Sequence, residues 1–202
     1  MTQKDLEGLI ERNSAVETVS TETGINAGLK LAELAEKASI QWAFAGGIAM
    51  HIYGFVRATT DVDVIAGDLL SLESKKKLSF GGESYQVEVG GNLITVDWIV
   101  RNDEHAKFYL PALTDALEIK NGIRIVSPEW LVILKHLSGR PKDELDLIWL
   151  LQEIDLVDRE LVVKNIENVL GEYAIYLIRD LQSEFDYADV VRMRGERNKY
   201  EE

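Results

Sequence analysis

The sequence predicts an α+β protein in which a mixed β-sheet is flanked by helices and followed by a C-terminal helical region. Three observations predict it. Stretches that alternate apolar and polar residues lie in the middle of the chain, apolar residues at helical spacing precede them, and several helical patterns follow. The expected division is a core over residues 1–126 and a helical region over residues 127–202 that packs on the core.

The core supplies the expected strands. The first 22 residues are polar with scattered leucines, and we expect a short helix or an arm there. Residues 26–38 repeat leucine and alanine at helical spacing. The strand segments are short and rich in β-branched residues, and a short helix is expected between the first two. Strands are expected over residues 41–45, 61–66, 85–89 and 93–100, and that short helix over 48–53.

Turn and capping signals organise the remainder. Asn121-Gly122 separates two short apolar segments and predicts a hairpin. Ser127 followed by Pro128 is typical of a helix start, since serine caps the first turn and proline suits its first position. Helices are expected over residues 128–137, 142–153, 158–170 and 172–185. The cluster Lys75–Lys77 is interpreted as a solvated turn.

Composition excludes several classes of function. The 202 residues contain 22 Lys and Arg against 35 Asp and Glu, a net charge of −13, which argues against non-specific DNA binding. The absence of cysteine excludes disulfides, thiolate zinc sites and a cysteine nucleophile. We expect no membrane association and a cytoplasmic location, because the sequence has neither a long apolar run nor a signal peptide pattern.

Three carboxylates point to metal chemistry. Strict alternation places Asp61 and Asp63 on one face of a strand, where their charges repel and Mg²⁺ would relieve the repulsion. Asp97 interrupts an otherwise apolar strand. Beside the first strand, it would complete a metal triad or accept a proton from an attacking hydroxyl. The alternative is an ion pair between Asp97 and Arg101 at a strand edge.

A glycine turn supplies the second component. Gly46-Gly47 leads directly into the expected short helix, where backbone N–H groups can approach a phosphate closely. A phosphate site beside a carboxylate pair suits phosphoryl transfer from a nucleotide.

Together these residues resemble a known signature. Gly46-Gly47, thirteen further residues, Asp61 and Asp63, and the later Asp97 resemble the nucleotidyltransferase superfamily with its polymerase-beta-like fold. Gly47 stands where many relatives carry serine, so a Gly47→Ser variant is expected to keep nucleotide binding.

The resemblance extends to a smaller group. The order Arg57, Thr59, Asp61, Asp63 is similar to the minimal nucleotidyltransferases around the AbiEii-type toxins of bacterial toxin–antitoxin pairs. A later segment matches that group at Lys135, Arg140, Lys142, Asp143 and Asp146.

The resemblance implies a reaction and its partners. One or two Mg²⁺ ions on Asp61, Asp63 and Asp97 would assist transfer of an NMP from an NTP, such as ATP, to an acceptor hydroxyl on tRNA, protein or a small molecule. An antitoxin protein is an expected partner. An antibiotic adenylyltransferase and a catalytically inactive interaction module are the alternatives. Nucleotide-binding positions implied by the resemblance are Gly46, Gly47, Arg57, Thr59, Lys135, Arg140 and Lys142.

Overall fold

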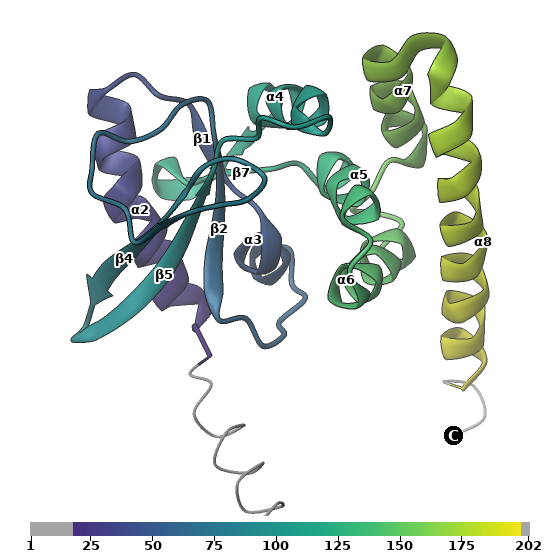
Figure 1. The fold of residues 1–202 in the computed structure, drawn as a ribbon. Helices are drawn as coiled ribbons and strands as arrows, with labels where there is room; N and C mark the ends of the chain where they lie inside the picture. Colours follow the sequence, from purple (N-terminus) through teal and green to yellow (C-terminus); the bar gives the residue numbers. More distant parts are fainter. Residues whose placement is uncertain (1–17, 199–202) are drawn as a thin grey trace, which may run out of the picture.

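A seven-stranded mixed β-sheet with helices on both faces forms the body of the protein (Figure 1). The computed structural model describes residues 18–198, so most of the expected N-terminal arm lies outside the described residues. The strand order across the sheet is β3-β4-β5-β2-β1-β7-β6. The predicted α+β class, with a mixed sheet followed by helices, is confirmed.

The strands agree with the alternation in the sequence. Asp61–Ala66 forms β2 with the predicted bounds, and the Lys-rich segment interpreted as a turn forms a two-residue exposed edge strand, β3. The seven strands are β1 (Trp42–Phe44), β2 (Asp61–Ala66), β3 (Lys76–Lys77), β4 (Glu83–Val89), β5 (Asn92–Ile99), β6 (Leu117–Glu118) and β7 (Arg124–Ile125).

The helices follow the expected order with two differences. The helix α4 is not predicted by the sequence pattern, because Pro111 in its interior is typical of a helix break. The last helix, α8, continues to Asn198 rather than ending near residue 185. The helices are α2 (Thr21–Lys37), α3 (Gly46–Ile52), α4 (Ala106–Thr114), α5 (Pro128–Ser138), α6 (Pro141–Gln152), α7 (Arg159–Leu170) and α8 (Ala174–Asn198). None of the helices in the described part of the chain is long and apolar enough to cross a bilayer.

The sheet separates two apolar cores. Val62 and Val64 of β2 are fully buried on the face that α2 covers. Ile65 belongs to the other core, which extends through α5 and α6 as far as Ala188 of α8. That second core therefore joins the sheet to the C-terminal helices, while the division at residue 126 stays a prediction.

The Asn-Gly hairpin directs α5 across the second face of the sheet. Asn121 and Gly122 have φ of 64° and 71°, as the predicted turn requires, and β6 pairs antiparallel with β7. Because β7 runs parallel to β1, the chain leaves the sheet beside β1 and enters α5. The Ser127 hydroxyl accepts a hydrogen bond from Trp130 N and caps this helix, as predicted.

Candidate active site

The three predicted carboxylates lie on two neighbouring strands. β2 and β5 run parallel, with Asp63 opposite Asp97 and Asp61 opposite Thr95. Opposite residues point to the same face, so Asp97 lies on the strand beside β2 and on the face that carries Asp63. Among residues 18–198, no three His, Asp or Glu side chains converge closely enough as they stand to hold a metal ion.

We call Asp61, Asp63 and Asp97 the carboxylate row. Its negative charges are poorly compensated by neighbouring groups. Burial, together with the nearby Asp61 charge, raises the pKa of Asp63 to about 6, and Lys135 opposes the shift. The Oδ1 atom of Asp97 is buried and has no hydrogen-bond partner among the described residues. A bound cation would relieve both conditions.

The alternative role of Asp97 is wrong. Arg101 forms its ion pair with Asp103 at 2.7 Å, and it bonds His105 Nδ1 at 2.9 Å. Its guanidinium also lies 4.9 Å from the ring centres of Phe80 and Tyr109. Asp97 is therefore not the structural partner of Arg101.

Gly46 brings the turn backbone against Asp63. Its φ is +53°, and a Cβ at this position would overlap the Asp63 carboxylate. The neighbouring Ala45 N donates to the Asp63 carbonyl at 2.9 Å. Only glycine fits here, and it places the first residue of α3 next to the Asp63 carboxylate.

Gly47 packs on Thr59 instead. A Cβ at Gly47 would lie 2.6 Å from Thr59 Oγ1. Thr59 is buried, and its hydroxyl donates to the Asp61 carbonyl at 3.2 Å. A serine side chain here would displace Thr59, which supports Asp61, so the structure argues against the expectation that Gly47→Ser keeps nucleotide binding.

Gly46→Ala is expected to lower the melting temperature by more than about 6 °C, because the new Cβ meets the Asp63 carboxylate in addition to the strain of a positive φ. Gly90→Ala is the matched control, since Gly90 has φ +60° and a Cβ added there would meet no atom within 4 Å. The control should lose only about 2–4 °C. Equal losses in thermal unfolding would show that Gly46 does not contact Asp63.

A cluster of ion pairs around two buried aspartates lies beside the carboxylate row. We call it the charge cluster: Arg57, Lys135, Arg140, Asp143 and Asp146. Both aspartates have no exposed surface. Lys135 Nζ lies 2.5 Å from Asp143 Oδ1 and 2.6 Å from Asp146 Oδ2. Arg57 bonds both oxygens of Asp146, and Arg140 Nε lies 2.5 Å from Asp143 Oδ2.

The charge cluster gathers residues that the sequence resemblance groups together. It brings Arg57 from the loop before β2 to Lys135 on α5 and to two aspartates of α6. The ammonium of Lys135 is buried and paired with both aspartates, so in this arrangement it is not free to contact a phosphate. Lys142 is exposed on α6 and is not part of the cluster.

Lys135→Met is expected to lower the melting temperature by more than about 6 °C, because it leaves two buried carboxylates short of a cation. Arg179→Met removes an exposed ion pair, 3.7 Å long with Asp180, and should cost less than about 2 °C. Thermal unfolding of both variants compares the two. Similar small losses would contradict a structural role for Lys135.

The charge cluster is expected to lose stability in acid. Although burial raises the pKa of Asp143, its contacts with Lys135, Ser138 and Arg140 outweigh this and lower the pKa to about 2. A lowered pKa in the folded chain contributes stability above the ordinary value of 3.8, and this stability is lost as pH falls toward about 2.

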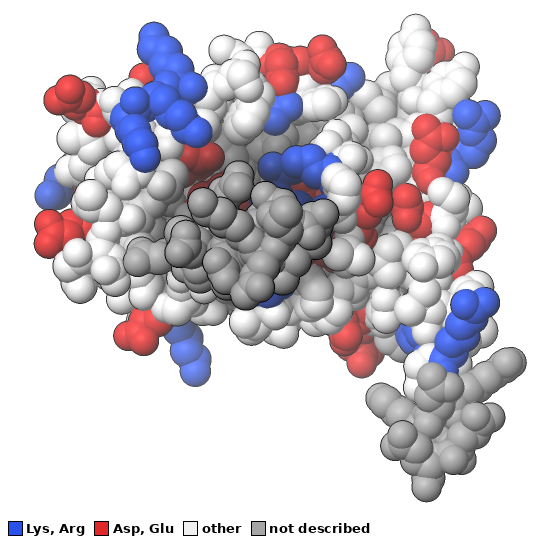
Figure 2. Space-filling model, turned by 60° about the horizontal axis from the view of Figure 1, so that its bottom comes forward, with Lys and Arg blue, Asp and Glu red and all other residues white. Residues whose placement is uncertain are grey.

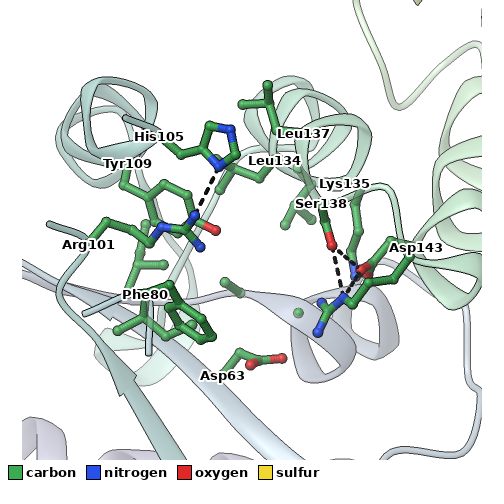
Figure 3. Close-up of a pocket in the computed structure, with 16 residues that line it drawn as sticks. Asp63, Phe80, Arg101, His105, Tyr109, Leu134, Lys135, Leu137, Ser138 and Asp143 are labelled. Carbon is green, nitrogen blue, oxygen red and sulfur yellow. Dashed lines mark hydrogen bonds and ion pairs between the residues drawn. The ribbon is translucent and has the colours of Figure 1, made fainter. Parts of the chain in front are cut away.

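A cavity of about 270 Å³ opens between the carboxylate row and α5 (Figure 3). Asp63 lies at one side, with Lys135, Ser138 and Asp143 across the cavity from the stack of Tyr109, Arg101 and Phe80. Ile65, Ile99, Leu131, Leu134 and Leu137 supply apolar wall.

Sequence reasoning missed the aromatic and Arg101 side of this cavity. Tyr109 lies on α4, which the sequence pattern does not predict, and His105 immediately precedes that helix. The sequence signal that could have found this side is the four-residue spacing of Arg101, His105 and Tyr109.

Charge on the outer surface is mixed. On the face shown in Figure 2, basic and acidic side chains are interspersed and do not form one continuous basic surface. This distribution agrees with the net charge of −13.

No family model matches the sequence, and no curated protein matches it. An antigenic nucleotidyltransferase-like protein from Paracoccidioides brasiliensis matches in structure, with 18% identity over 84% of this chain and 95% of that one, at a TM-score of 0.49. The antibiotic-resistance factor ANT(2'')-Ia in solution matches at 14% identity over 88% of this chain and 100% of that one, TM-score 0.38. A crystal structure of ANT(2'')-Ia in complex with adenylyl-2''-tobramycin matches at 16% identity over 75% of this chain and 99% of that one, at a TM-score of 0.42.

Proposed function

We propose that the protein is a metal-dependent nucleotidyltransferase that moves an NMP from an NTP to an acceptor hydroxyl. The observation that supports it is the row of Asp63 and Asp97 on adjacent strands, with a glycine turn packed directly on Asp63. A carboxylate pair beside a glycine turn whose backbone can approach a phosphate suits phosphoryl transfer.

The donor set fits Mg²⁺. Asp61, Asp63 and Asp97 offer hard oxygen ligands, the Asp97 Oδ1 atom is buried without a partner among the described residues, and the charge on Asp63 is disfavoured as the site stands. These three residues would hold one or two ions, with a modest adjustment of side chains. When bound, Mg²⁺ neutralises triphosphate charge and stabilises the charge that develops during transfer.

The protein's own groups have separate roles. The backbone at Gly46 and Gly47 orients the phosphates, and Arg140, which lines the cavity and is 56% exposed, contributes positive charge. Asp97 accepts the proton of the acceptor hydroxyl. The hydroxyl oxygen then bonds to the α-phosphorus, the bond from that phosphorus to the β-phosphate oxygen breaks, and pyrophosphate leaves.

The lining of the cavity bears on the acceptor. Arg101, Lys135 and Arg140 line it together with Asp63 and Asp143, and each of these three cations is already paired with an aspartate. The lining therefore carries no excess of free positive charge. We propose a tRNA or protein acceptor on the resemblance of the site residues to the AbiEii-type group, and the aminoglycoside pool below tests the alternative.

The direct test is incubation of the full chain with Mg²⁺ and each α-labelled NTP against separate tRNA, protein and aminoglycoside pools. The expected result is transfer of label to tRNA or protein with release of pyrophosphate, and none with EDTA. Label on aminoglycoside would support the antibiotic adenylyltransferase instead. Absence of any transfer with every NTP and pool would overturn the enzymatic proposal and favour the inactive interaction module.

The toxin role has a test of its own. Induced expression of the parent chain in a bacterial host should stop growth, and the Asp61→Asn variant, expressed at the same level, should not. Growth that is arrested equally by both would separate toxicity from nucleotide transfer. Relief by co-expression of a neighbouring reading frame would identify the antitoxin partner.

A further inference from the structure

Ser84 extends the carboxylate row by one strand. β4 lies beside β5 on the side away from β2, and Ser84 of β4 is opposite Asp97, which is opposite Asp63. Opposite residues of neighbouring strands point to the same face. Ser84, Asp97 and Asp63 therefore form one row across three strands, and the Ser84 end is fully buried, with 0% exposure.

Two atoms of this row lack partners. In the described part of the chain, three buried side-chain atoms have no hydrogen-bond partner, and two of them are Ser84 Oγ and Asp97 Oδ1. Leaving a buried hydroxyl or carboxylate oxygen unpaired destabilises a protein. The Cβ atoms of opposite residues lie about 4.5–5.5 Å apart. At this separation, rotation of the Ser84 and Asp97 side chains brings the hydroxyl and the carboxylate within hydrogen-bond distance.

We propose that Ser84 is a positioning residue whose hydroxyl donates to Asp97 Oδ1 and holds this carboxylate in its working orientation. The other carboxylate oxygen is then directed toward Asp63 and whatever binds between them. Serine suits this role because it supplies a neutral donor that does not compete with a bound cation. Arg101, the nearest candidate cation in sequence, is held by Asp103 instead.

The catalytic consequence of this contact rests on the proposed function, but the contact itself does not. The first experiment therefore uses the metal-free full chain in EDTA. Ser84→Ala should lower the melting temperature by about 3–6 °C, since a hydrogen bond to a buried carboxylate is lost. Ser84→Cys, of similar size but with a weak donor, should behave like Ser84→Ala. A raised melting temperature in Ser84→Ala would overturn the proposal, because it would show that the hydroxyl is unpaired.

A double-mutant cycle assigns the loss to Asp97. In the Asp97→Ala background, Ser84→Ala should cost less than about 1 °C or stabilise the chain, since the acceptor is already absent. An unchanged cost in that background would place the partner of Ser84 elsewhere and overturn the proposal.

The second experiment measures what the contact does for the site. Ser84→Ala should raise the Mn²⁺ concentration that half-saturates the thermal shift by at least about tenfold. It should lower kcat by at least about tenfold while KM for the NTP stays within about threefold, and Ser84→Thr, which keeps the hydroxyl, should restore most of both. Unchanged Mn²⁺ half-saturation in Ser84→Ala would contradict the positioning role.

Ser127→Ala is the matched control. Ser127 is also buried, but its hydroxyl caps α5. This variant should lose thermal stability with no change in the Mn²⁺ concentration that half-saturates the thermal shift. If that concentration changed as much in Ser127→Ala as in Ser84→Ala, the effect of Ser84→Ala would be general destabilisation, and the positioning role would be overturned.

If the parent chain transfers no nucleotide, the proposed function fails, while the metal-free double-mutant cycle still decides whether Ser84 contacts Asp97. If the parent is active and the cycle shows no coupling, only this inference fails.

Discussion

Asp63→Asn is expected to abolish the rise in melting temperature that Mg²⁺ or Mn²⁺ with a non-hydrolysable NTP produces in the parent chain. A ligand that binds only the folded state raises its stability by mass action, about 2.7 kcal/mol at one hundred times Kd. Asp63 lies between Asp97 on β5 and the Gly46 turn. Replacing its carboxylate by an amide removes this ligand while the shape of the side chain is kept.

The same variant should be more stable than the parent without metal. Burial and the Asp61 charge raise the pKa of Asp63 from 3.8 to about 6. A pKa raised in the folded chain favours folding below the unfolded value, and this contribution is lost as pH rises through about 6. At pH 7 the parent therefore carries an unfavourable charge, and Asp63→Asn should gain on the order of 1–3 kcal/mol.

Thermal unfolding from pH 4 to 8, with and without metal, tests both effects. The advantage of Asp63→Asn should shrink below pH 6, and the metal response of the parent should weaken over the same range as Asp63 becomes protonated. Glu118→Gln, which removes an exposed strand carboxylate, is the control and should change neither. A normal metal response in Asp63→Asn would remove the central claim of the proposed function.

Asp97→Ala is expected to lower kcat by at least about 10² while KM for the NTP changes less than tenfold. Asp97 is proposed to take the proton of the acceptor, so its loss acts on turnover more than on nucleotide binding. The variant should fold, because Asp97 holds no cation among the described residues and Arg101 is paired with Asp103.

Steady-state kinetics and a melting curve without metal together test this role. Full activity in Asp97→Ala would remove Asp97 from the reaction. A fall in melting temperature of more than about 6 °C, with the remaining folded chain fully active, would instead make Asp97 a structural residue.

Local signals in the sequence determined much of the fold. The alternation of Asp61–Ala66 fixes which side chains share a face, since successive residues of a strand point to opposite sides. Ser127-Pro128 starts α5, and Asn121-Gly122 makes the hairpin turn, because each needs only its own backbone conformation. The acidic pair Asp61 and Asp63 and the glycine turn are therefore evident from the sequence alone.

Some elements depend on packing that local patterns do not report. α4 forms despite Pro111 because Phe108, Ala112 and Leu113 are buried in the second core. The stack of Arg101 on Tyr109 then follows from that helix, so the aromatic side of the cavity could not be predicted from propensity.

Only the tertiary structure decided the partners of the charged residues. Strand register places Asp97 between Asp63 and Ser84, and register is set by pairing between segments that are distant in the sequence. Likewise, the fold buries Lys135 against Asp143 and Asp146 and leaves Lys142 exposed, although all four belong to one short stretch of sequence. The sequence alone indicated most of the candidate site residues, and the tertiary structure determined which of them meet, because burial and charge compensation depend on neighbours in space.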